Sequence, residues 1–440
     1  MNLAGWGRFP CHECNVARPR SEEALRALMS RGSLIARGNG RAYGDSALSR
    51  TNTADMSAFN RMLAFDAKTG QLIAEAGLLL ADVISVFLPR GWFPAVTPGT
   101  KFVTIGGMVA ADVHGKNHHK DGSFGVFVDW IDVMDPEGVV RRCSLRDNTD
   151  LFAWTIGGMG LTGVILRAAF RLRPAETGWI WQTTIPAANL DEAIDAFEGH
   201  GAATYSVAWI DCLAPGPKLG RSLVILGEHT TLDELPAQHR SEPFKTPAKR
   251  AFSVPIDAPA GLLNRLSVRA FNALYYWNGC RKASVQLVDW DSYFYPLDAI
   301  LGWNRVYGRK GFAQFQCVLP LETSKPGLQA MLQATSGAGA GSFLAVLKRL
   351  GPQNSRFSFP MAGYTLALDF PVNRQTLALM DRLDAITLDH GGRFYLAKDS
   401  RMTAATLAAS DSRIASFKAM RRETGSALAF ASAQSERLAL

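Results

Sequence analysis

The sequence predicts an α+β protein of two domains, the second of which is built on an antiparallel sheet. The chain has 440 residues, and at roughly 150 residues per domain this length favours two domains, or one interrupted by the other. Hydrophobic residues make up 47% of the chain and charged residues 20%. This composition supports packed cores and excludes a disordered or fibrous chain. From about residue 178 onward, strand-like runs of β-branched and aromatic residues predominate.

The first part of the chain alternates strand-like and helical segments between Gly and Pro turns. Ser21 is predicted to cap a first helix over residues 21–30, since Glu22 and Glu23 follow it in the first turn. Apolar patterning predicts the following elements: strands at 33–38, 71–77, 102–109, 126–135 and 139–145, and helices at 80–91 and 148–157.

The second part is predicted to be a sheet with helices following it. Its segments have the length and β-branched or aromatic content of strands, and the last ones have helical periodicity. The predicted elements are strands at 179–186, 205–213, 222–229, 312–320, 343–351 and 364–372, and helices at 375–391 and 404–425.

The charge and the cysteines restrict the class of partner and compartment. Lys plus Arg number 47 and Asp plus Glu 39, a net charge of +8 that is too small to indicate a nucleic-acid partner. Six scattered cysteines, including the C-x-x-C of Cys11 and Cys14, form no disulfide framework and favour a reducing compartment. No signal peptide or membrane-spanning run is visible. We therefore expect a cytoplasmic protein that at most contacts the inner membrane surface.

Glycine-rich segments carry the first chemical signal. The loop 38–44 lacks the amphipathic helix that a Rossmann turn would open, so alone it is either a plain turn or a nest of backbone N–H groups for a pyrophosphate. Further glycine-rich segments follow at 98–108, 114–125 and 154–165. Because glycine weakens helices and strands, this repetition predicts close approach of the backbone to one large ligand.

A metal site is the rival interpretation of the histidines. His114 and His118 are four residues apart, but Gly115, Asn117 and Gly122 make a helix that presents both to a metal improbable. No acidic residue lies between them as in H-E-x-x-H. We expect no metal, and a loop of donors for a polar or anionic ligand.

The order of several motifs resembles a known family. The segments GNGRAYGD, PGT followed by TIGGMVA, GSFG and FAWTIGGMGLTGVI resemble the FAD-binding domain of the vanillyl-alcohol-oxidase-type flavoproteins. Six further segments resemble one group within that family, the decaprenylphosphoryl-ribose 2′-oxidases. They are WGR at 6–8, DVHGKNHHKDGSFG at 112–125, PKLGR at 217–221, WNRVYG at 303–308, FSFP at 357–360 and YLAKDSR at 395–401. The resemblance runs from about residue 4 to the C-terminus. It implies an FAD-binding domain at 1–177 and 393–440 around a substrate-binding domain at 178–392.

The resemblance also implies an FAD site. Arg41 stands where many members of the superfamily carry a histidine that tethers the flavin, so we expect FAD to be held without a covalent bond. The implied FAD contacts are Ala36, Arg37, Gly38, Asn39, Gly40, Arg41, Ala42, Tyr43, Gly44, Asp45, Ser46, Gly99, Thr104, Ile105, Gly106, Gly107, Ala111, Asp112, Val113, His114, Ile165 and Tyr395.

Catalytic roles are implied for Lys398, Tyr395, His114 and Tyr43, with Lys398 as a cation beside the reduced flavin. Its alternative is a surface ion pair with Asp399. The predicted substrate-binding residues are Lys116, Trp209, Gln314, Gln316, Lys348 and Asp369.

Two of these predictions also follow from strand patterning. Gln314 and Gln316 alternate with Phe315, which places both amides on one face, either in the pocket or in solvent. Lys348 interrupts an apolar run, where an anionic partner would remove the cost of burying its charge.

The resemblance implies oxidation of a secondary hydroxyl of a sugar, namely the 2′-hydroxyl of a polyprenyl-phosphoryl ribose. This would be the first half of an epimerisation to the arabinose donor used in cell-wall synthesis. A separate NAD(P)-dependent reductase would be the partner. The alternatives are a free-sugar or aldonolactone oxidase and a non-catalytic flavin-binding subunit.

Two features qualify the resemblance. Members of the group have a cysteine and an asparagine where this chain has Ala367 and Thr365, which alters the pocket. The segment 240–282 is interpreted either as an ordinary amphipathic helix with a solvated face or as a mobile lid that meets anionic lipid headgroups. Its basic residues are Arg240, Lys245, Lys249, Arg250, Arg265, Arg269, Arg281 and Lys282.

Overall fold

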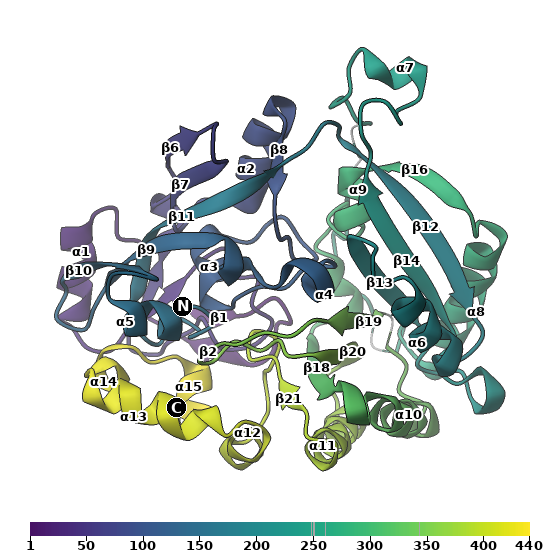
Figure 1. Cartoon of the computed structure of the whole chain (residues 1–440). Helices are drawn as coiled ribbons and strands as arrows, with labels where there is room; N and C mark the ends of the chain where they lie inside the picture. Colours follow the sequence, from purple (N-terminus) through teal and green to yellow (C-terminus); the bar gives the residue numbers. More distant parts are fainter. Residues whose placement is uncertain (248, 250, 260, 343) are drawn as a thin grey trace.

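The computed structural model describes residues 1–247, 249, 251–259, 261–342 and 344–440, so Arg250 lies outside the described residues. The architecture is α+β with a large antiparallel sheet, which confirms the predicted fold class. Figure 1 shows the N-terminal strands and helices on one side, the large sheet with its helices on the other, and the C-terminal helices beneath the N-terminal part.

The first sheet belongs to the N-terminal part of the chain and is antiparallel. Its strand order is β10 (Val140–Ser144), β9 (Val128–Met134), β11 (Val164–Pro174), β7 (Gln71–Glu75) and β6 (Met62–Asp66), and β8 (Trp92–Pro94) also pairs with β11. The helices around it are α2 (Leu80–Phe87), α3 (Ile105–Ala110) and α5 (Thr149–Thr155). A small parallel sheet of β3 (Val16–Ala17), β5 (Thr53–Asp55) and β4 (Ile35–Arg37) leads the chain into the glycine-rich loop.

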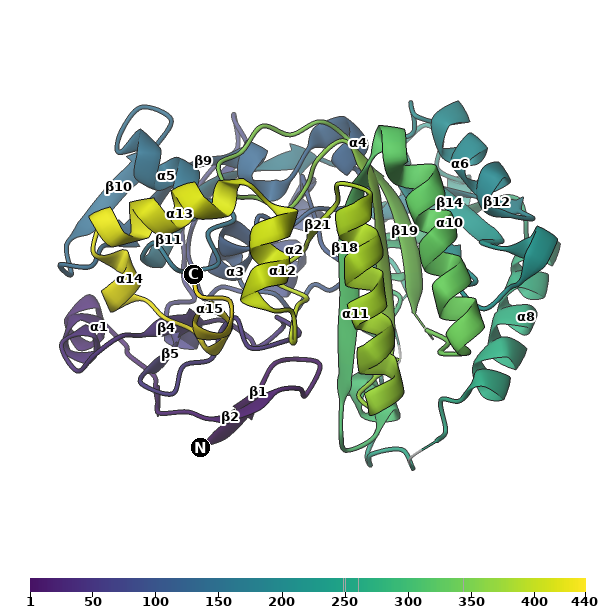
Figure 2. The ribbon, with the colours of Figure 1, turned by 90° about the horizontal axis from the view of Figure 1, so that it is seen from below.

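The large sheet has helices packed on one face. Its strand order is β16 (Val285–Asp289), β12 (Trp179–Ala187), β14 (Ser222–His229), β13 (Tyr205–Ile210), β19 (Ala345–Leu350), β20 (Gly363–Pro371), β18 (Phe312–Pro320) and β21 (Arg393–Phe394). Helix α8 (Arg265–Arg281) packs on the other side of β12 and β14, where Tyr275 contacts Trp209 and Gly279 approaches Leu223. Figure 2 shows the first face covered by α6 (Leu190–Gly199), α10 (Leu321–Ala338) and α11 (Arg374–Asp389). Apolar side chains of these helices and of the strands form one buried core, so the part of the opposite face that α8 does not cover is available for a site.

The remaining elements are short. They are β1 (Asn2–Ala4) paired with β2 (Cys11–Glu13), β15 (Phe252–Ser253) paired with β17 (Ile300–Leu301), and the helices α1 (Glu22–Met29), α4 (His118–Asp121), α7 (Ala237–Arg240) and α9 (Trp290–Phe294).

The C-terminal helices return to the N-terminal part of the chain, as Figure 2 shows. They are α12 (Ala404–Ser410), α13 (Arg413–Glu423), α14 (Ser426–Ala429) and α15 (Ala433–Arg437). Leu34 forms a β-bridge with Phe430. Arg437 donates to Asp45 Oδ1 at 2.7 Å and to Asp399 Oδ2 at 2.9 Å, which ties the glycine-rich loop to the YLAKDSR segment. The division of the chain at 177/178 and 392/393 stays a prediction.

Two predicted elements differ from the structure. The predicted strand 102–109 contains helix α3, because the Thr104 side chain accepts a hydrogen bond from Gly107 N and caps a helical turn there. The predicted helix 404–425 is broken between α12 and α13, where Asp411 is extended and accepts hydrogen bonds from Arg413. In both cases a short polar side chain competes for the backbone, an effect that apolar periodicity does not report.

Within the described residues, no helix is long and apolar enough to cross a membrane. In the same part of the chain, His, Cys, Asp and Glu side chains nowhere form a group of three or more that could hold a metal ion.

The ion pairs of Arg437 are expected to carry much of the stability of this junction. In Arg437→Met the buried carboxylates of Asp45 and Asp399 lose their shared cation, and the free energy of unfolding should fall by about 3 kcal/mol. Denaturant titration measures the change, and Arg422→Met on the exposed side of α13 is the matched control. Equal stability of the two variants would contradict this assignment.

Candidate active site

A cavity of about 350 Å³ lies among the glycine-rich segments, the large sheet and the YLAKDSR segment. The glycine-rich loop after β4 forms one wall. The backbone N–H groups of residues 38–42 donate no hydrogen bond to any described residue. The loop is nevertheless held in place, since Tyr43 N donates to Ala397 O and Ala42 O accepts from Trp6 N. A fixed run of unpartnered N–H groups suits an anionic group such as a pyrophosphate.

The second glycine-rich segment supplies space beside the loop. Ile105 N donates to Leu78 O, Gly106 N donates to Ala76 O, and Gly107 N is capped by Thr104 Oγ1. A Cβ added at Gly99 would meet no atom within 4 Å. This segment therefore leaves room beside the loop, while the N–H groups of Ile105, Gly106 and Gly107 are already used.

The large sheet forms the opposite wall with alternate residues of three neighbouring strands. Gln314 of β18 pairs with Asp369 of β20, Gln316 pairs with Ala367, and Thr365 pairs with Lys348 of β19. All six residues line the cavity. The sequence had left open whether Gln314 and Gln316 face solvent, and both are in fact buried.

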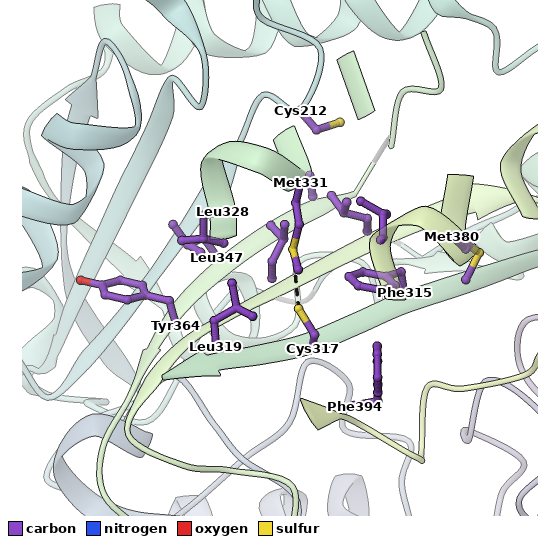
Figure 3. Close-up of a cluster of buried hydrophobic side chains, with 14 of the residues drawn as sticks. Cys212, Phe315, Cys317, Leu319, Leu328, Met331, Leu347, Tyr364, Met380 and Phe394 are labelled. Atoms are coloured by element: carbon purple, nitrogen blue, oxygen red, sulfur yellow. Dashed lines mark hydrogen bonds between the residues drawn. The ribbon is translucent and has the colours of Figure 1, made fainter. Parts of the chain in front are cut away.

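The other face of the same strands is apolar. Figure 3 shows Phe315, Cys317, Leu319 and Leu347 in a buried cluster with Leu328 and Met331 of α10. Period-two alternation thus separates a polar cavity surface from the hydrophobic core within one layer of backbone.

Lys398 and Tyr395 reach the cavity from the C-terminal part of the chain. Lys398 Nζ lies 3.5 Å from the ring centroid of Tyr43, so it is no surface partner of Asp399. Tyr395 stacks on Phe359 with 4.7 Å between ring centroids and donates to Ala111 O at 3.3 Å. The segment is held by Asp399, whose Oδ2 accepts from Arg437.

The buried charges of the cavity influence each other. Burial lowers the pKa of Lys398, while the nearby Asp369 carboxylate raises it and Lys348 lowers it. Burial raises the pKa of Asp369 above its usual range, although Gln314 and Lys398 oppose this shift. Burial also lowers the pKa of Lys348 to about 8. The pKa values of these three groups are therefore shifted toward neutral pH, as is common for groups in functional sites.

A chain of hydrogen bonds fixes the state of His114. The Cys317 carbonyl can only accept, so the Thr365 hydroxyl donates to it at 2.7 Å. Gln316 Nε2 then donates to Thr365 Oγ1 at 3.2 Å and to His114 Nε2 at 3.3 Å. His114 therefore carries its proton on Nδ1, a buried atom with no partner among the described residues. Burial, Lys348, His118 and Lys398 hold the pKa of His114 well below 6.5.

The cavity brings together most of the residues that the sequence singled out. Those that line it are Ala36, Gly38, Asn39, Gly40, Arg41, Ala42, Tyr43, Ser46, Gly99, Thr104, Gly106, Gly107, Ala111, Val113, His114, Ile165, Gln314, Gln316, Lys348, Asp369, Tyr395 and Lys398. Their assigned roles stay predictions.

The other predicted residues lie outside the lining and contact protein instead. Lys116 donates to Tyr293 O and lies 4.1 Å from the Tyr293 ring centroid, and Trp209 packs on Tyr275 with 4.8 Å between centroids. The cofactor candidates outside the lining are Arg37, Gly44, Asp45, Ile105 and Asp112. Asp45 holds the glycine-rich loop through its ion pair with Arg437.

Sequence reasoning assigned no role to several lining residues. Trp6 and Trp303 pack edge to face with 5.8 Å between centroids, and both line the cavity beside Asp298. The motifs WGR and WNRVYG, which contain these residues, could have indicated that they belong to the site. The Arg41 guanidinium lies 4.1 Å from the Trp6 ring centroid and packs on this aromatic wall.

Comparison with known proteins identifies the family. Residues 15–144 match the FAD binding domain family. Over its full length the chain is 36% identical to decaprenylphosphoryl-beta-D-ribose oxidase of Mycolicibacterium smegmatis, and the match spans 97% of that protein. The chain belongs to the FAD-dependent oxidases of the vanillyl-alcohol-oxidase family.

Shorter matches place this oxidase within the wider family. L-gulonolactone oxidase of Mus musculus is 28% identical over 37% of the chain and 36% of its own length. Cytokinin dehydrogenase 5 of Arabidopsis thaliana is 33% identical over 24% of the chain and 19% of its own length. The unpartnered N–H groups of residues 38–42 and the buried cations that line the same cavity fit the anionic pyrophosphate and the redox-active ring of FAD.

The hydrogen-bond chain predicts the tautomer of His114 in the oxidase. Long-range nitrogen-15 NMR should show a neutral imidazole protonated on Nδ1 at pH 6, because burial opposes the charged form and Gln316 donates to Nε2. In Gln316→Leu this donor is lost, and a mixture of tautomers is expected. A form protonated on Nε2 in the unsubstituted protein would contradict the order of donors.

Proposed function

We propose that this oxidase converts a secondary hydroxyl of a sugar to a ketone, and that its substrate is a polyprenyl-phosphoryl ribose oxidised at the 2′-hydroxyl. The observation that carries the proposal is the set of polar side chains that the large sheet directs into the cavity. Gln314, Gln316 and Asp369 offer donors and acceptors for sugar hydroxyls, while Lys348 offers a buried cation for a phosphate. The full-length similarity to decaprenylphosphoryl-beta-D-ribose oxidase supports this choice of substrate.

FAD is proposed to bind without a covalent bond. The N–H groups of residues 38–42 would hold its pyrophosphate. The family resemblance implies that Arg41 stands where other members carry the tethering histidine. When bound, FAD supplies the acceptor for the hydride that leaves the hydroxyl-bearing carbon.

Lys398 is proposed to take the proton of the reacting hydroxyl at Nζ. The pKa of Lys398 is lowered by burial, so a neutral amine is accessible near neutral pH. Once protonated, Lys398 becomes a cation that Asp369 stabilises. Tyr43, whose ring lies against Nζ, and His114, which presents Nδ1–H, hold the reacting group in place.

The product would be a keto-sugar, and a separate NAD(P)-dependent reductase would complete the epimerisation to arabinose. A second candidate is a lactone oxidase, favoured by the similarity to L-gulonolactone oxidase over part of the chain.

Flavin bleaching under anaerobic conditions distinguishes these functions. We expect bleaching with polyprenyl-phosphoryl ribose and little with free ribose or an aldonolactone, because Lys348 would then lack its phosphate. Bleaching by the lactone alone would favour the second candidate. Bleaching by none of them would indicate a non-catalytic subunit.

The mode of flavin attachment is tested by acid denaturation followed by filtration. All of the flavin should pass the filter, since Arg41 offers no nucleophile for a bond to the isoalloxazine ring. Flavin that stays with the denatured chain would contradict non-covalent binding.

The role of Lys398 is tested by Lys398→Met. The rate of anaerobic bleaching should fall about 10²- to 10⁴-fold, the range expected when a general base is removed, while the FAD content is retained. Lys310→Met, at an exposed position, is the matched control. An unchanged rate would remove Lys398 from the mechanism.

The pairing of Asp369 with Lys398 predicts a shift in the pH profile. Asp369 raises the pKa of Lys398, so Asp369→Asn should lower this pKa further and move the acidic limb of kcat/KM to lower pH. Asp389→Asn, at an exposed site on α11, is the control. A limb that moves to higher pH would contradict Lys398 as the base.

A further inference from the structure

Exposed apolar side chains are concentrated in one segment of the molecule. Among the described residues, ten of the eighteen large apolar side chains that are exposed lie between Phe252 and Leu301. Isolated exposed apolar residues are ordinary, but such a concentration marks an interaction surface. Helix α8 carries the largest part of it.

One face of α8 is held by the protein. Val268 and Asn272 are buried, and Asn272 Nδ2 donates to Asp211 Oδ1 at 2.7 Å. Tyr276 donates to Ala187 O at 3.2 Å. The helix packs against β12 and β14 in this way and lies at the outer edge of the sheet in Figures 1 and 2. Its orientation on the sheet is therefore fixed.

The opposite face of α8 is also apolar. Leu266, Ala270, Ala273 and Trp277 follow one another at spacings of four, three and four residues, so they form one stripe along the helix. All four are exposed, with 77% of Leu266 and 53% of Trp277 accessible. The inward face of α8 already packs on the sheet, so packing within the described protein does not account for a second apolar stripe.

The charges beside the stripe have one sign. From residue 258 to residue 288 the chain has no acidic residue and four basic ones, Arg265, Arg269, Arg281 and Lys282. None of the four forms an ion pair with a described residue. The Arg281 guanidinium lies 4.6 Å from the ring centroid of Trp277, where the apolar stripe meets the basic residues.

We propose that the outward face of α8 is a docking surface for an anionic lipid membrane, on which the helix lies parallel to the surface. Leu266 and Trp277 would enter the headgroup region, and the four basic residues would contact lipid phosphates. The charge complementarity selects this occupant, because a second copy of the chain would bring the same four cations against one another. The inference goes beyond the proposed function, and its test involves no turnover.

Vesicle flotation with the FAD-loaded full-length protein tests the proposal. The protein is expected to float with vesicles of phosphatidylcholine and phosphatidylglycerol in equal amounts, to float much less with phosphatidylcholine alone, and to be released by high salt. Brominated lipids should quench its tryptophan fluorescence, and Trp277→Phe should lose most of this quenching.

Two double variants separate the apolar and the basic contributions. Leu266→Gln with Trp277→Gln should weaken vesicle binding about tenfold or more. Arg269→Gln with Lys282→Gln should weaken it about fivefold for each cation removed. The matched controls are Leu145→Gln with Leu428→Gln, also at exposed apolar sites, and Lys68→Gln with Arg146→Gln, at exposed basic sites. The controls should bind as the unsubstituted protein does.

Three results would overturn the proposal. The first is failure of the unsubstituted protein to bind the anionic vesicles at low salt. The second is equal weakening by the α8 variants and their controls. The third is a mass in solution, without vesicles, that shows a dimer lost in Leu266→Gln with Trp277→Gln, because a second copy would then cover the stripe. Failure of the proposed oxidation would leave all three readouts interpretable, since none depends on substrate.

Discussion

The pairing of β18, β19 and β20 is the constraint on which the site and the core both depend. Because side chains alternate along a strand, every residue that this register directs toward the cavity has a neighbour directed into the core. Gln314, Gln316 and Asp369 face the cavity, whereas Phe315 and Leu368 lie in the core. A shift of the strand register by one residue would bury the amides and the carboxylate among apolar side chains and turn the core residues toward the cavity. Both changes are unfavourable, so both faces of the sheet select the observed register.

Burial then determines the chemistry of the cavity. Lys348, Lys398 and Asp369 are withdrawn from water, and the charged form of each is disfavoured unless another buried group compensates it. Lys398 and Asp369 compensate one another. Among the described residues no carboxylate does so for Lys348, and burial lowers its pKa to about 8. The cavity therefore holds a cation for which an anionic ligand is the natural partner, and a lysine whose proton is loosely held.

Attachment of distant segments makes this arrangement rigid. Arg437 joins Asp45 behind the glycine-rich loop to Asp399 beside Lys398, so residues that are more than 350 positions apart in the chain are held at one point. Helix α8 is attached on one face only. Asn272 holds that face to Asp211, and the opposite face is exposed.

The sequence by itself determined the fold class, most of the strands of the large sheet and the family, because apolar periodicity and ordered motifs are local properties of the chain. It also placed Gln314 and Gln316 on one face, but not which face. Helix α3 and the break between α12 and α13 were decided by short polar side chains that bond the nearby backbone, which apolar periodicity does not report. The positions of Lys116 and Trp209 outside the cavity lining were decided by contacts with residues distant in the sequence. The tautomer of His114, the lowered pKa of Lys398 and the outward stripe of α8 arise only when the backbone brings distant residues together, since burial and electrostatic coupling depend on distance in space.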